Sequence, residues 1–98
     1  MMADDEFTLR RQLDRAAKAR VVLENDLVIE TFAMLEERYA ATWKATAARD
    51  EEGRRMCWYS WKGLELFREE FRQMLSDGKI ASAQLQFMDA EQERTKRS

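Results

Sequence analysis

The chain has 98 residues, of which 45% are hydrophobic and 37% charged, and its formal net charge is −2 at pH 7. It contains one cysteine and neither histidine nor proline. The length predicts a single domain, and the apolar fraction is too high for a disordered chain. The missing histidine excludes histidine-based catalysis and metal binding, and one cysteine excludes an internal disulfide. No apolar run reaches the length of a membrane span, and the acidic start is unlike a signal peptide, so we expect a cytoplasmic protein.

The first predicted helix covers residues 6–23. Apolar side chains recur at every fourth position on one side of it. The opposite side carries a basic group, which consists of Arg11, Arg15 and Lys18.

The second predicted helix covers residues 26–44, after a joint at Asn25, a residue type preferred as an N-cap. Its apolar residues follow one another at intervals of four, three, four and four positions, which places them in one stripe that faces the core. The stripe consists of Val28, Phe32, Leu35, Tyr39 and Trp43. The pattern leaves open whether residues 6–44 form one helix or two.

The third predicted helix covers residues 50–76, with Asp50 as its N-cap and two glutamates in its first turn. Gly78 suits the left-handed position after a helix C-terminus, so we expect the helix to end at Asp77-Gly78. A short last helix is expected over residues 82–91.

The short link before Asp50 predicts that the second and third helices pack as an antiparallel hairpin. The predicted fold is therefore all-α. It consists of this hairpin as the core, an additional N-terminal helix and a short C-terminal helix, in a single domain that is expected to be oligomeric.

The third helix has a seam of apolar and small residues along one side. Together with the stretch Trp58-Tyr59-Ser60-Trp61, this seam makes the helix apolar over more than half of its circumference. The seam contains Met56/Cys57, Ser60, Gly63/Leu64, Phe67, Phe71 and Met74/Leu75. Either the terminal helices cover this surface, or it is an oligomer or partner interface, where Trp and Tyr are enriched. Ser60 and Gly63 would let another helix approach closely. We expect the interface anchors to be Trp43, Trp58, Tyr59, Trp61, Phe67 and Phe71.

Two charged surfaces are candidates for contacts. Arg11, Arg15 and Lys18 form a possible anion-binding face. An acidic surface follows in the second helix and contains Glu30, Glu36 and Glu37. The negative net charge does not favour nucleic acid as the partner, whereas opposite patches on one chain favour contact between copies.

No catalytic residue, cofactor site or metal site is expected, so the chain is predicted not to be an enzyme. Glu65 and Arg68 form an i, i+3 pair on an exposed face. Cys57 is expected to be a small buried hydrophobic residue, because no second cysteine or histidine accompanies it.

Several stretches resemble small all-helical proteins encoded by phages and prophages, over about residues 24–81. They are Glu24-Asn25-Asp26-Leu27, Phe32, Trp43-Lys44-Ala45-Thr46, Ala48-Arg49-Asp50, Gly53-Arg54 and Ser76-Asp77-Gly78-Lys79-Ile80-Ala81. Small terminase subunits, which are helical hairpins that form rings, are comparable. This chain lacks their DNA-binding domain.

The resemblance implies a viral protein in the bacterial host cell or the virion, with a role in virion assembly or DNA packaging. We therefore expect a non-enzymatic protein that self-associates and binds a protein partner. The alternative is a phage antagonist of host immunity, either an anti-CRISPR protein or one that sequesters a nucleotide signal, acting through a charged surface.

Overall fold

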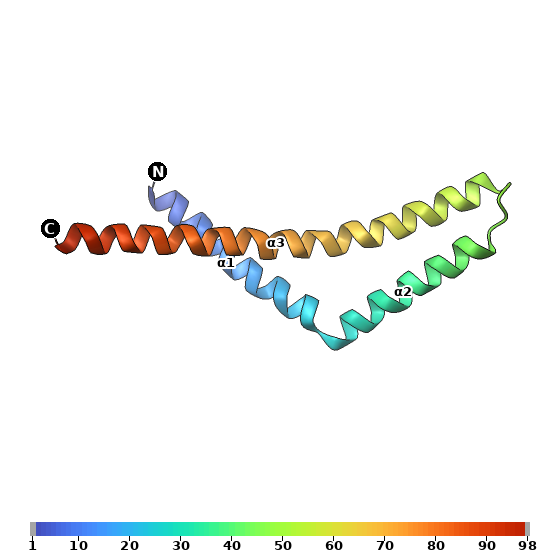
Figure 1. Cartoon of the computed structure of the whole chain (residues 1–98), viewed down its shortest axis with the longest axis horizontal. Coiled ribbons are helices and arrows are strands. Elements are labelled where there is room, and N and C mark those ends of the chain that lie inside the picture. The colour runs from blue at the N-terminus through green and yellow to red at the C-terminus, as the bar shows by residue number, and fades with distance from the viewer. Residues whose placement is uncertain (1, 98) are drawn as a thin grey trace. The chain divides into compact units, whose positions relative to one another are not determined.

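The computed structural model describes residues 2–97, which form three α-helices (Figure 1). They are α1 (Met2–Glu24), α2 (Asp26–Ala45) and α3 (Glu51–Arg97). The described residues contain no strand, which confirms the predicted all-α class.

Contacts between residues divide the molecule into two units. The central unit is Val22–Glu70, and the terminal unit combines residues 2–21 with residues 71–97. Helix α3 contributes to both units, because their boundary falls within it.

The joint between α1 and α2 lies at Asn25, so residues 6–44 form two helices. Asn25 has an extended backbone, with φ −69° and ψ 123°, and caps α2. Its Oδ1 accepts a hydrogen bond from the backbone N–H of Val28 at 3.1 Å. This bond satisfies one of the N–H groups that a helix N-terminus leaves without an intrahelical partner, which explains why α2 begins here.

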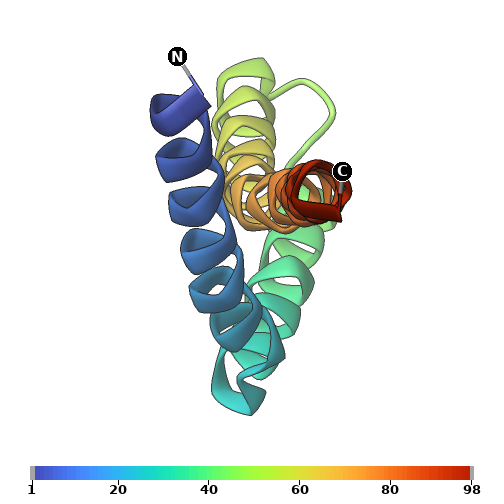
Figure 2. The ribbon, with the colours of Figure 1, turned by 90° about the vertical axis from the view of Figure 1, so that its left-hand side faces the viewer.

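Residues 46–50 form the non-helical turn between α2 and α3 (Figure 2), and hydrogen bonds close both of its ends. Asp50 Oδ1 accepts from the backbone N–H of Gly53 at 2.9 Å, which confirms Asp50 as the predicted N-cap. At the other end of the turn, the Thr46 N–H donates to the carbonyl of Thr42 at 3.0 Å and ends α2.

Helix α3 does not end at Asp77-Gly78, and the predicted separate helix over residues 82–91 is wrong. The helix continues to Arg97, and Gly78 has a negative φ. Gly78 is buried, and a Cβ added to it would collide with the Cβ of Ala16 on α1. Glycine stands here because α1 passes close to α3, rather than because the helix ends.

Small side chains surround this close approach in the terminal unit. Ala19 is 2% exposed and Ala81 is 0% exposed, and Ala16 and Leu85 are also buried. The terminal unit is therefore held by close backbone approach, with Leu85 as its one large buried side chain among the described residues.

In the central unit, the earlier residues of α2 contact α3 at positions 67 and 68, and the later residues of α2 contact α3 at positions 57 and 54. Starting from the N-terminal part of α2, the pairs are Phe32 with Phe67, Glu36 with Arg68, Tyr39 with Cys57, and Trp43 with Arg54. Among the hydrophobic residues of this unit, Phe32 and Cys57 are the two that are buried.

The Gly78 packing predicts that Gly78→Ala destabilises the protein although alanine favours helix. The expected loss is about 1–3 kcal/mol in the free energy of unfolding, since the added methyl group overpacks against Ala16. Urea unfolding followed by circular dichroism measures this change.

Two variants control for that measurement. Ser76→Ala, at an exposed position two residues earlier, is expected to leave stability unchanged or slightly higher. Ala16→Gly combined with Gly78→Ala is expected to recover part of the loss, because it removes the opposing methyl group. A Gly78→Ala protein as stable as the unmodified chain contradicts the close approach.

Candidate functional site

Arg68 joins α2 to α3 in the central unit. Its Nη2 lies 2.6 Å from Glu36 Oε1 on α2 and 3.4 Å from Glu65 Oε1 on α3. Its guanidinium also lies 5.4 Å from the centre of the Phe32 ring. With 22% of the Arg68 side chain and 34% of the Glu36 side chain exposed, the cross-helix pair is partly shielded from water, so screening weakens it less than an exposed pair.

Arg54 also links α2 to α3, at the turn between the two helices. Its guanidinium lies 4.6 Å from the centre of the Trp43 ring, within the range of a cation–π contact. Its Nε donates to the carbonyl of Ala47 at 3.4 Å, beside the end of α2. Arg54 thus holds the Trp43 ring against the start of α3.

Cys57 is buried, as predicted, and its Sγ donates to the carbonyl of Tyr39 at 3.3 Å. The predicted Glu65–Arg68 pair on α3 is present, but its predicted exposed position is wrong, because only 22% of the Arg68 side chain is exposed. The link from Arg68 across to Glu36 was not predicted.

The six predicted interface anchors have different environments. Trp58 and Tyr59 are 50% and 62% exposed, and their rings meet edge to face with centroids 5.2 Å apart. Phe67 is 59% exposed, with its ring centre 6.3 Å from that of Phe32. Three anchors are half-buried, namely Trp43, Trp61 and Phe71.

An open groove brings the three tryptophans together. It has a volume of about 400 Å³ and lies beside Lys62 and Glu65. A second groove of about 330 Å³ is almost wholly apolar and includes Phe32, Leu64 and Phe67. Both grooves lie in the central unit, so α2 leaves apolar side chains accessible along α3.

The predicted seam of α3 separates into an inner and an outer part. Its inner positions, Cys57, Leu64 and Phe71, are buried or half-buried. A different set of side chains on α3 is exposed, and we call it the outer face. The outer face consists of Met56, Tyr59, Ser60, Gly63, Leu66 and Phe67.

The basic group of α1 is exposed, but its neighbours balance part of its charge. Lys18 lies 3.0 Å from Asp14, and the adjacent Arg10 lies 3.1 Å from Glu6. Arg11 lies 6.0 Å from the centre of the Phe7 ring, and Arg15 shares its surface.

Of the predicted acidic surface, Glu30 and Glu37 are exposed, whereas Glu36 is held by Arg68. The periodic spacing of α2 places Glu36 near its contact stripe, four residues after Phe32, and this is the signal that identifies it as a packing residue.

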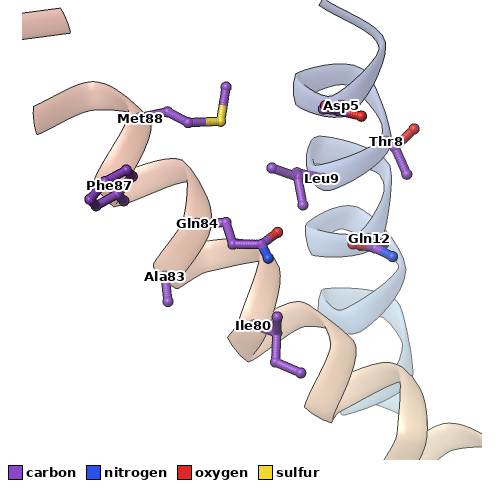
Figure 3. Close-up of a pocket in the computed structure, with 9 residues that line it drawn as sticks. All are labelled: Asp5, Thr8, Leu9, Gln12, Ile80, Ala83, Gln84, Phe87 and Met88. Atoms are coloured by element: carbon purple, nitrogen blue, oxygen red, sulfur yellow. The ribbon is translucent and has the colours of Figure 1, made fainter. Parts of the chain in front are cut away.

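The terminal unit contains a further open groove between α1 and α3, with a volume of about 790 Å³ (Figure 3). Leu9, Gln84 and Met88 extend into the space between the two helices. Ile80 and Phe87 are 55% and 65% exposed along its α3 side. Besides apolar side chains, the lining of the groove includes the Asp5 carboxylate, the Thr8 hydroxyl and the amides of Gln12 and Gln84.

Within the described residues, no cluster of three or more His, Cys, Asp or Glu side chains is placed to hold a metal ion. No helix of this part of the chain is long and apolar enough to cross a membrane. No protein-family model, curated protein or solved structure matches the chain.

The Arg68 geometry predicts that Glu36→Ala lowers the free energy of unfolding by about 1–2 kcal/mol, because it leaves a half-buried guanidinium without its cross-helix acceptor. Glu37→Ala, at the adjacent exposed position, is the matched control and is expected to change stability by less than about 0.5 kcal/mol. Urea unfolding at one fixed protein concentration measures both changes. Equal effects of the two substitutions would show that the cross-helix pair does not stabilise the central unit.

Proposed function

We propose that this chain is a non-enzymatic helical protein of the phage or prophage type, which self-associates and binds a protein partner in virion assembly or DNA packaging. The observation that carries self-association is the exposed apolar surface of the central unit. In that unit Met56, Trp58, Tyr59, Leu66 and Phe67 are each at least half exposed.

This exposure differs from the scattered apolar residues of an ordinary surface. The five side chains lie within twelve consecutive positions of one helix, and grooves containing aromatic rings adjoin them. Exposed apolar groups gathered along one element mark interaction surfaces, and Trp and Tyr are frequent anchors in them. Burying such a patch against another molecule removes apolar area from water and stabilises the complex.

The internal ion pairs favour self-association over action through a charged surface. Glu36 is neutralised by Arg68, and Lys18 lies beside Asp14. A phage antagonist that mimics nucleic acid or binds a nucleotide needs a strong field of one sign, which these pairs reduce.

Light scattering or sedimentation equilibrium of the full chain tests self-association. At micromolar concentrations we expect a mass that is a multiple of the chain mass of 11.6 kDa, falling on dilution. A mass of one chain throughout this range would contradict self-association.

Capture experiments test the assembly role separately. Recovery of capsid, portal or packaging-motor proteins from infected cells supports it. Recovery of a host defence complex, or of a bound nucleotide, would support the antagonist instead.

A further inference from the structure

The outer face of α3 has the pattern of a helix that packs against another helix. Met56, Ser60, Gly63 and Phe67 advance by four, three and four residues, the spacing of a coiled-coil seam. Met56 and Phe67 are 65% and 59% exposed, and Ser60 and Gly63 are also exposed. Helix α2 meets this seam only at its Phe67 end, where the Phe32 and Phe67 ring centres lie 6.3 Å apart, and it leaves Met56, Ser60 and Gly63 exposed.

The glycine of this seam has no explanation within its own chain. A Cβ added to Gly53 would collide with the Asp50 carboxylate, and one added to Gly78 would collide with Ala16. Around Gly63 there is no atom within 4 Å of an added Cβ. Glycine weakens a helix interior relative to alanine, so an exposed glycine here is unfavourable in an isolated chain. The missing side chain of Gly63 would allow the backbone of a neighbouring helix to approach closely.

We propose that a second copy of this chain docks on the outer face, with the two α3 helices antiparallel. The proposal deepens the self-association proposed above and rests on it. A two-fold axis near residues 61 and 62 places Ser60 opposite Gly63 of the other copy, and Met56 opposite Phe67 of the other copy. Small side chains then meet at the centre, where the helices approach closely, and large apolar side chains meet on either side.

The side chains that border the seam fit the same arrangement. Tyr59 and Leu66 are 62% and 58% exposed. The two-fold axis brings Tyr59 of each copy beside Leu66 of the other copy. In a two-fold interface each patch must complement itself in this way.

Charge selects the antiparallel orientation. Arg55 and Glu70 are exposed on opposite sides of the proposed axis. Antiparallel docking brings Arg55 of each copy alongside Glu70 of the other, whereas parallel docking leaves these two opposite charges about 22 Å apart along the helices. The opposite charges therefore favour the antiparallel pair.

The area is sufficient for a specific but modest contact. The exposed parts of Met56, Tyr59, Leu66 and Phe67 present on the order of 500 Å² per copy, given the size of such side chains. A symmetric pair therefore buries roughly 1,000 Å², near the lower limit of specific interfaces.

Disulfide trapping tests the register. In a Cys57→Ala background, Met56→Cys chains are mixed with Phe67→Cys chains that carry a mass tag, and the mixture is oxidised at micromolar concentration. We expect a covalent heterodimer, because residues 56 and 67 of different copies meet within disulfide reach. Met56→Cys alone should not cross-link, because its two copies lie ~16 Å apart along the antiparallel helices. Met34→Cys mixed with Phe67→Cys is the control, since the exposed Met34 lies on α2 outside the outer face.

The outcomes separate this inference from the proposed function. Cross-linking of Met56→Cys with itself would show a parallel pair and overturn the proposal. A multiple-chain mass without the heterodimer would place the contact on another surface, and would also overturn it while leaving self-association intact. A single-chain mass would overturn both.

Charge reversal gives a second test that leaves every apolar contact in place. Arg55→Glu or Glu70→Arg alone is expected to weaken self-association about 3- to 10-fold, since two exposed pairs are affected in each dimer. The double variant Arg55→Glu/Glu70→Arg is expected to return to within about 2-fold of the unmodified chain. If the double variant is weaker than either single variant, Arg55 does not face Glu70 and the register is wrong.

Discussion

Helix α3 carries apolar side chains on more of its circumference than α2 can cover, and this constraint determines the organisation of the central unit. One helix packs against one stripe of its neighbour, and α2 takes the inner stripe that contains Cys57 and Leu64. Met56 and Phe67 belong to a different stripe and remain exposed. This exposed stripe is the surface on which we propose that another molecule docks.

The contacts that hold α2 to α3 are largely polar and aromatic rather than a filled core. Arg68 lies against both Glu36 and the Phe32 ring, and Arg54 stacks on Trp43. A small unit built in this way buries little apolar area, so its stability depends on such specific pairs and on what covers the outer face. Binding of the proposed second copy would stabilise the folded chain by mass action and so couple folding to assembly.

The elements that the sequence predicted correctly are set by local chemistry. Asn25 and Asp50 cap the helices that follow them, and a cap depends on a side chain and a backbone N–H only three residues away. The all-α class follows for the same reason, because strong helix formers occur throughout a chain without proline.

The misplaced end of α3 and the link between Glu36 and Arg68 depend on non-local contacts. Glycine suits both a helix C-terminus and a close helix crossing, and only the presence of Ala16 beside Gly78 distinguishes the two. Spacing alone joined Arg68 to Glu65 along one helix, whereas the contact with Glu36 requires the register between α2 and α3. The seam of α3 also depends on non-local contacts. Its inner and outer positions alternate closely along the chain, so apolar spacing alone does not show which of them face α2.

In the proposed dimer, two copies of α3 meet antiparallel on their outer faces. Pulsed electron–electron resonance tests this arrangement on a chain with a spin label at Glu52→Cys in a Cys57→Ala background. The proposed axis lies about ten residues beyond position 52, so we expect a distance of roughly 30 Å between the two labels, given the rise of 1.5 Å per residue. A distance below about 20 Å would indicate a parallel pair, and the absence of any intermolecular distance at micromolar concentration would contradict the docking of a second copy.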